Sequence, residues 1–429
     1  MHLLNRKTPP DRQPSSPFVL ETPHLRRLSN HIPCYSFFNS RLELIHFLLR
    51  VDGGTLYETR KGITSATFSL LNESAPGHTS AETEDFLDYH GTVYKVSIGH
   101  DYVDIQFIIP KQNVGTVLEF VTRFLSTPKF REESLVLYRQ REIQNLQYND
   151  LKSTYIAKQN MYAALLHPDL LAARRLEESD LRALSVQDME TCHSKVFAAN
   201  HIKIFVAGHI DEDIHDAIER VFGNLPSVDG LSCPRLWATR SPEGQVVQTE
   251  MPDRVQSSLI LCRKGLPYLH PDRRDFSVLT TLLGGYFGSR LMQNLRETHG
   301  YTYGVHCSHH DIGDASIFYI KTEVNADKTE DALLQCRKEL SRLQTELVPE
   351  EELDTVKNYM IGSWARQVDG TINYMKMYAF WFSVGVDEQE YGRRLESISQ
   401  ITPERVRTLA RSYLLPERFT TVVAGKINP

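Results

Sequence analysis

Two residues in the second half of the sequence have the types and the spacing to bind one oxygen atom together. Arg296 and Tyr303 flank Gly300 in the run LLGGYFGSRLMQNLRETHGYTYGV (282–305). The pattern predicts a helix that Arg296 closes, a turn at Gly300 and a strand that Tyr303 begins, so two hydrogen-bond donors can converge on one point. A structural role also explains each residue alone, because arginine is favoured at helix C-termini and tyrosine in sheets.

Three histidines follow directly, His306, His309 and His310 in HCSHHDIGD (306–314), and histidine is a common metal ligand. On a strand His306 and His310 share a face, but their spacing is wide for one metal ion and no fourth ligand is evident. The polar end of a hairpin is therefore the favoured interpretation of the segment. GGYFGSR (284–290) matches neither GxGxxG nor a P-loop, and no GxSxG or catalytic-cysteine motif occurs. Nucleotide binding and nucleophilic hydrolysis are therefore not indicated.

The elements that must position these residues repeat along the chain. Residues 184–210 align without a gap with residues 401–427, and HGTVYKV (90–96) aligns with HGYTYGV (299–305). The first pair predicts a capped helix followed by a buried strand, and the second a helix that stops at a glycine. Further strands are predicted over 42–51, 102–110, 257–263 and 316–324, and a helix over 114–125. The sequence therefore predicts an α+β fold with two homologous domains, each a mostly antiparallel sheet flanked by helices.

Composition supplies the boundaries and excludes some functions. We expect a Pro-rich extended arm or a disordered tail over 1–23, domains over 24–226 and 244–429, and a linker over 227–243. A net charge of −6 provides no basic face for nucleic acid or an anionic membrane. No apolar run approaches the ~20 residues of a membrane span. Six isolated cysteines and an N-terminal stretch without a signal-peptide core predict a cytoplasmic protein.

Taken together, these features resemble the M16 (insulinase or pitrilysin-like) metallopeptidase family, in particular its short two-domain branch, which includes subunits of mitochondrial processing peptidase. The resemblance covers nearly the whole chain from about residue 24, and residues 282–305 are its strongest local match. It implies the M16 metallopeptidase/LuxS-like fold and two chains that close like a clamshell over a peptide. It also implies that Arg296 and Tyr303 hold the substrate carbonyl beside the scissile bond, where oxyanion charge develops.

Active members of that family carry HxxEH on the first helix of the first domain, with two histidines as zinc ligands and the glutamate as general base. The matching segment here is GITSATFSLL (62–71), whose register puts Ser65, Phe68 and Ser69 at the three positions. Glu142 falls where a third ligand would stand, but a lone carboxylate cannot hold a catalytic zinc. Neither HxxEH nor HExxH occurs anywhere in the sequence. The chain alone is therefore predicted to be inactive, with no metal ligands and no cofactor of its own.

Three functions remain compatible with this pattern. In the first, the chain is the non-catalytic subunit of a heterodimeric zinc peptidase: it supplies Arg296 and Tyr303, and a zinc-bearing sister subunit binds the peptide substrate as an added strand. In the second, a homodimeric pseudoenzyme binds peptides or acts as a scaffold without peptidase activity. In the third, dispersed residues such as Glu142, His306 and His310 form a relocated metal site. Retention of LRETHGYTY beside a lost zinc motif favours the first.

Overall fold

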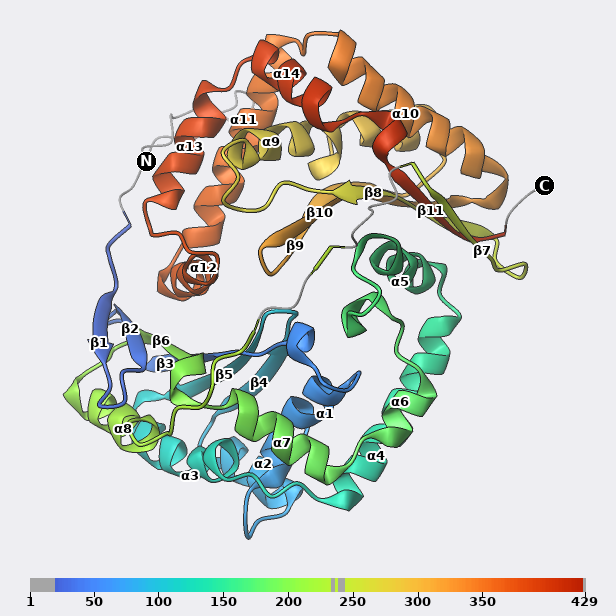
Figure 1. The fold of residues 1–429 in the computed structure, drawn as a ribbon. Coiled ribbons are helices and arrows are strands. Elements are labelled where there is room, and N and C mark those ends of the chain that lie inside the picture. Colours follow the sequence, from blue (N-terminus) through green and yellow to red (C-terminus); the bar gives the residue numbers. More distant parts are fainter. Residues whose placement is uncertain (1–19, 233–235, 238–243, 427–429) are drawn as a thin grey trace, which may run out of the picture.

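The computed structural model describes residues 20–232, 236–237 and 244–426. It contains two β-sheets, each flanked by helices, that lie one above the other with further helices between them (Figure 1). This architecture confirms the predicted α+β fold with two homologous domains. The exact domain boundaries stay a prediction, and residues 1–19 of the predicted arm and parts of the predicted linker lie outside the described residues.

The first sheet has six strands in the order β1-β2-β6-β3-β5-β4, and every neighbouring pair except β2 and β6 is antiparallel. Its strands are β1 (His24–Arg27), β2 (Pro33–Phe38), β3 (Leu44–Asp52), β4 (Val93–Ile98), β5 (Tyr102–Pro110) and β6 (Ile202–Gly208). The helices below it in Figure 1 are α1 (Ile63–Ser69), α2 (Ser80–Tyr89), α3 (Val114–Ser126), α7 (Val186–Val196) and α8 (Glu212–Phe222). One hydrophobic core joins these helices to the lower face of the sheet.

The second sheet has five strands in the order β7-β11-β8-β10-β9, antiparallel except for β7 and β11. Its strands are β7 (Val246–Glu250), β8 (Gln256–Lys264), β9 (Val305–Ile312), β10 (Ala315–Asn325) and β11 (Thr420–Gly425). Above it in Figure 1 lie α9 (Arg273–Thr280), α10 (Thr329–Thr345), α11 (Glu350–Val368), α13 (Glu390–Gln400) and α14 (Pro403–Tyr413). β4 and β9 are therefore equivalent edge strands of the two sheets.

Local sequence explains where the repeated elements begin and end. Ser185 and Thr402 cap α7 and α14 by accepting a hydrogen bond from a backbone N–H three residues later, as the aligned segments predict. Gly91 and Gly300 have φ of 61° and 63°, the left-handed conformation predicted for the glycine that follows each helix. Along β5 the side chains alternate between buried and partly buried, because one face of the strand packs on the core.

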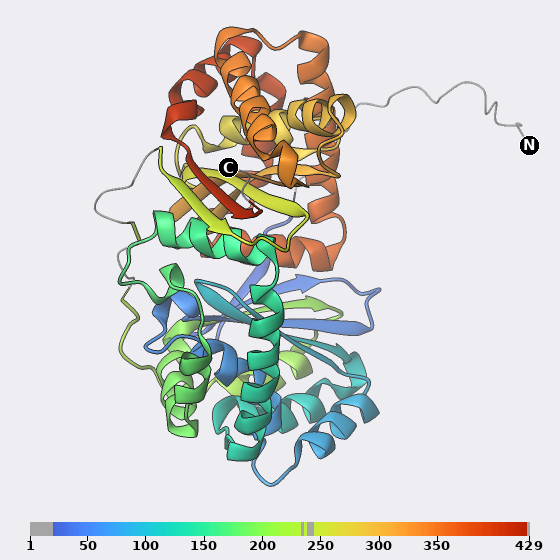
Figure 2. The ribbon, with the colours of Figure 1, turned by 90° about the vertical axis from the view of Figure 1, so that its right-hand side faces the viewer.

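Each half contributes one helix to the other half's sheet. A 19-residue helix, α4 (Glu132–Asp150) or α11, is followed in each half by a 13-residue helix, α5 (Ser153–Leu165) or α12 (Thr371–Ser383). α5 packs against β8 and β11 of the second sheet, and α12 packs against β2 and β6 of the first. Figure 2 shows α5 lying directly beneath the second sheet. The two halves are thus joined through their cores and not only through the linker.

A buried arginine strengthens this junction. The Arg50 side chain on β3 is 5% exposed and forms two hydrogen bonds with Asp104, from Nε to Oδ1 (2.8 Å) and from Nη2 to Oδ2 (2.7 Å). Its Nη1 donates to the carbonyl oxygen of Ala379 (2.5 Å) and to Ser383 Oγ (2.7 Å) in the last turn of α12. A first-half cation therefore hydrogen-bonds one backbone carbonyl and one hydroxyl near the C-terminus of a second-half helix, where positive charge is favourable.

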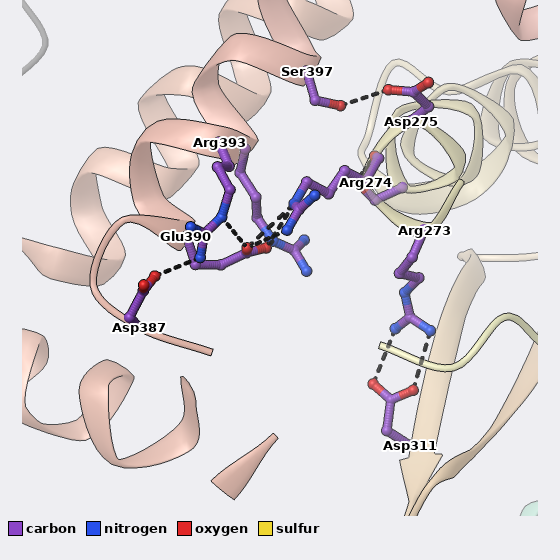
Figure 3. A network of polar contacts seen from close by, with 10 residues as sticks. Arg273, Arg274, Asp275, Asp311, Asp387, Glu390, Arg393 and Ser397 are labelled. Atoms are coloured by element: carbon purple, nitrogen blue, oxygen red, sulfur yellow. Dashed lines mark hydrogen bonds and ion pairs between the residues drawn. The ribbon is translucent and has the colours of Figure 1, made fainter. Parts of the chain in front are cut away.

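A second polar network holds the helices of the second half together (Figure 3). Glu390 on α13 has a side chain that is 1% exposed and accepts hydrogen bonds from Arg274 on α9 and from Arg393 and Arg394 on its own helix. Next to it, Arg273 pairs with Asp311 of β9 at 3.0 Å. The network thus connects α13, α9 and the edge strand of the second sheet.

Candidate functional site

The helix that the resemblance places over 62–71 forms as α1, and none of its residues is His, Cys, Asp or Glu. α1 begins after Gly62 (φ 87°), and both oxygens of Glu58 accept hydrogen bonds there, from the N–H groups of Gly62 and Thr64, each at 3.1 Å. Phe68 is 0% exposed and belongs to the first-half core, whereas Ser65 is half-buried and Ser69 is exposed. The position of the general base in HxxEH is therefore occupied by a ring that packs in the core.

Glu142 lies on α4, at the position where the resemblance would place a third ligand. It is 28% exposed and accepts hydrogen bonds from Arg141 Nε and Asn145 Nδ2, both at 3.3 Å. Burial raises the pKa of the Tyr138 phenol, and the charges of Glu142 and Glu58 raise it further, so both carboxylates lie close to that ring. Among the described residues no group of three or more His, Cys, Asp or Glu side chains could hold a metal ion. The residues around α1 do not fit a catalytic zinc.

Arg296 and Tyr303 lie on either side of the turn at Gly300, and both reach solvent. Arg296 is in the last turn of a π-helical segment, Met292–Thr298, and its side chain is 37% exposed. Its guanidinium lies 4.6 Å from the centre of the Phe287 ring, with Nε 3.4 Å from Glu297 Oε1. Tyr303 is 91% exposed. The expectation that Tyr303 begins the strand is wrong by two residues, because β9 begins at Val305.

A cavity of about 780 Å³ lies beside this pair. Phe287 and Gly304 line it. The Arg296 guanidinium, which lies over Phe287, and Tyr303, which precedes Gly304, therefore stand at its rim. The lining comes from the end of α4, from α5, from the glycine-containing segment before Arg296 and from β8, β9 and β10: Asn149, Lys152, Thr154, Tyr155, Lys158, Met161, Tyr162, Ser258, Ile260, Gly284, Gly285, Tyr286, Phe287, Met292, Gly304, Val305, His306, His310, Tyr319, Lys321, Thr322 and Glu323. We call it the α5 cavity.

The α5 cavity exists because α5 covers only part of the lower face of the second sheet. α5 packs on β8 and β11, and the same face of β10 and β9 lines the cavity instead. The glycine segment closes one side by packing tightly on β9. A Cβ atom on Gly284 would lie 2.6 Å from Cys307 Cβ, so only glycine allows this approach.

The three histidines of β9 do not converge on one point. His306 and His310 line the α5 cavity, whereas His309 packs on the helix side, with its Nε2 3.2 Å from Thr280 Oγ1. His310 Nε2 lies 3.0 Å from the hydroxyl of Tyr162 on α5. Burial lowers the pKa of all three imidazoles. Because side chains alternate along a strand, His309 lies on the opposite face of β9 from His306 and His310. In the part of the chain that the structure describes, none of the three histidines forms a metal-binding group with Glu142.

The sequence indicates no functional role for α5. Its buried side chains include Ile156, Ala157, Met161 and Leu165, a spacing that predicts an ordinary amphipathic helix. Lys158 and Tyr162 then line the cavity only because α5 crosses to the second sheet. No signal within the helix could have identified that sheet as its partner.

The fold and the site first define a class of protein: a two-domain α+β chain in whose described residues no group of three or more His, Cys, Asp or Glu side chains could hold a metal ion. Comparison with known proteins agrees. Residues 183–360 match the family model described as the Peptidase M16 inactive domain. The "Uncharacterized zinc protease SCO5738" of Streptomyces coelicolor is 28% identical over 165 residues, which is 37% of this chain and 35% of that protein. The chain therefore matches only about a third of the length of that relative.

Two further comparisons extend over more of the chain. The "Non-peptidase homolog YmxG" of Helicobacter pylori is 21% identical over 74% of each chain. A crystal structure of a peptidase M16 inactive domain from Pseudomonas fluorescens has a TM-score of 0.86 at 18% identity, over 95% of this chain and 98% of that one. Residues 183–360 are thus similar to the M16 peptidase family, the whole chain shares the fold of M16 inactive-domain structures, and its sequence contains no HxxEH motif. None of the helices in the described ranges has the length and apolar character needed to span a bilayer.

Proposed function

We propose that this chain is the non-catalytic subunit of a cytoplasmic, two-chain M16 peptidase, in which a sister subunit bearing HxxEH supplies the zinc. The observation that carries the proposal is the contrast between two positions. Phe68 places a buried core side chain at the glutamate position of the zinc-binding motif. Arg296 and Tyr303, in contrast, stay exposed beside a cavity. An arginine and a tyrosine hydroxyl in water gain little for the fold, but they are well suited to hydrogen-bond a bound ligand.

The chemistry of the pair supports this role. When a peptide bond is attacked, negative charge develops on the carbonyl oxygen, and donors aimed at that oxygen stabilise the transition state. Arg296 presents a permanent positive charge that the ring of Phe287 orients, and Tyr303 presents a neutral hydroxyl. We propose that both groups contact the carbonyl of a peptide that is bound in extended form to the zinc-bearing partner.

The first experiment is affinity purification of the tagged chain from its native cell, followed by mass spectrometry of the copurifying proteins. The proposal predicts a stoichiometric partner of similar size that carries HxxEH. Recovery of the chain as a homodimer without such a partner would refute it. In that case the second hypothesis, a homodimeric pseudoenzyme that binds peptides, becomes the better one, and the name of the Helicobacter pylori relative, a non-peptidase homolog, favours it.

The second experiment measures kcat/KM of the recovered complex for a peptide substrate. Loss of one transition-state donor lowers kcat by about 10²- to 10³-fold in peptidases, so we expect a fall of that order for Arg296→Ala and a comparable or smaller fall for Tyr303→Phe. Arg366→Ala, at an exposed position of α11, is the matched control and should leave kcat/KM unchanged. Full activity of Arg296→Ala in an assembled complex would exclude the proposed role of the pair.

A further inference from the structure

The α5 cavity is basic, although the chain as a whole carries a net charge of −6. Three lysines line it, Lys152, Lys158 and Lys321, against a single carboxylate, that of Glu323. Lys158 extends from α5 and Lys321 from β10, so positive charge comes from two different walls of the cavity. An anion in the cavity would therefore be attracted from both sides.

Lys158 and Lys321, from two different walls, have no anionic partner among the described residues. In the part of the chain that the structure describes, neither Lys158 nor Lys321 has a carboxylate within 4.0 Å. Their charges act on the cavity histidines instead. After burial, Lys158 is the next cause of the lowered pKa of His310, and Lys321 is the next cause of the lowered pKa of His306. Both ammonium groups are thus close to imidazoles that remain neutral near pH 7 and cannot offset them.

The remainder of the cavity is aromatic and apolar. Tyr155, Tyr162, Tyr286, Phe287 and Tyr319 contribute rings. Ile260, Met161 and Val305 contribute apolar side chains that are at most 6% exposed. Its volume falls within the roughly 300–1,000 Å³ of ligand sites in proteins. This lining suits a short segment in which apolar and negatively charged groups alternate.

We infer that the α5 cavity binds an acidic peptide segment, with Lys158 and Lys321 pairing with its carboxylates and the aromatic walls holding its apolar side chains. This inference rests on the proposed function, because it names the class of peptide that the chain selects next to Arg296 and Tyr303. An extended peptide turns alternate side chains to opposite faces, so it can present carboxylates to the lysines and apolar groups to the rings. A peptide is favoured over a free phosphate because the cavity offers separated ammonium groups and rings rather than clustered backbone N–H groups.

The test is direct binding to the purified full chain, measured by fluorescence anisotropy at low salt. One probe is a fluorescein-labelled peptide in which leucine alternates with glutamate, and its twin has glutamine in place of every glutamate. The glutamate peptide should bind about five- to tenfold more tightly, as expected for two partly solvated ion pairs. The double variant Lys158→Gln/Lys321→Gln should abolish that difference, and Lys338→Gln, at an exposed position of α10, should preserve it.

Equal affinity for the two peptides, or a preference that survives in the double variant, would overturn the inference. So would competition by inorganic phosphate at concentrations comparable to those of the glutamate peptide, because the site would then be a phosphate site. These outcomes are separable from those of the proposed function. The binding assay needs no partner subunit, whereas the role of Arg296 and Tyr303 is measured only in the assembled complex.

Discussion

The contact between Arg50 and the end of α12 can be tested by removing the charge and keeping the side-chain stem, in Arg50→Met. The substitution deletes two hydrogen bonds to Asp104, one to Ala379 and one to Ser383. It leaves the Asp104 carboxylate, which is 14% exposed, without its counter-charge. Loss of one partner of a buried pair costs about 3–5 kcal/mol, and because Asp104 reaches some solvent we expect about 3 kcal/mol here.

The assay is urea denaturation followed by tryptophan fluorescence, because Trp381 on α12 is 0% exposed and reports whether α12 stays packed on the first sheet. Asp104→Leu alone should also destabilise, whereas Arg50→Met/Asp104→Leu should lose no more than either single variant. Arg41→Met, at an exposed position, is the surface control. An Arg50→Met variant within about 0.5 kcal/mol of the parent, or additive losses in the double variant, would refute the proposed junction.

Three further predictions concern stability. Glu390→Gln leaves three arginines around a side chain that is 1% exposed, so we expect a loss of about 3 kcal/mol in the free energy of unfolding; a loss below about 1 kcal/mol would contradict this. Burial lowers the pKa of His193 to about 4, so the unfolded chain binds a proton at higher pH than the folded chain does. The free energy of unfolding therefore falls as pH decreases from about 6.5 towards 4. His193→Gln should reduce the loss in unfolding free energy between pH 7 and pH 5 by about 2 kcal/mol, and an unchanged loss would argue against the shift. Gly284→Ala pushes a methyl group against Cys307 and should lower the free energy of unfolding by about 1–3 kcal/mol. Gly362→Ala, with open space around it in α11, should raise the free energy of unfolding by about 0.5–1 kcal/mol. Equal urea midpoints for the two variants would exclude the steric argument.

Local chemistry made most of the secondary structure predictable from the sequence. The strand predicted over 102–110 has those limits in the structure, and the helix predicted over 114–125 extends by one residue. The turns at Gly91 and Gly300 were predictable because both lie where a helix must stop and only glycine takes a positive φ without strain. Strand limits, helix limits and turns depend mainly on residues that are close together in the sequence, so they can be predicted from it.

The exchange of α5 and α12 between the halves was not predictable in the same way. Periodicity shows which face of a helix is buried but not which sheet buries it. The apolar face of α5 would suit either sheet, and only the structure shows that Ile156 and Met161 share a core with Ile260 of β8. The basic walls of the α5 cavity depend on that choice, because they combine residues from α5 with residues far away in the sequence.

Aromatic residues have opposite roles at the two segments that the resemblance to M16 proteins singles out. Phe68 fills the core at the position where the HxxEH motif has its glutamate and thereby contributes to stability. Phe287 and Tyr303 leave 62% and 91% of their surface in water at the rim of the α5 cavity, where they contribute little to folding. Large exposed aromatic side chains are typical of interaction sites, because covering them with a ligand or partner yields the free energy that folding did not. Substitutions at Phe287 and Tyr303 should therefore leave the unfolding free energy nearly unchanged, and any effect on function should arise from binding.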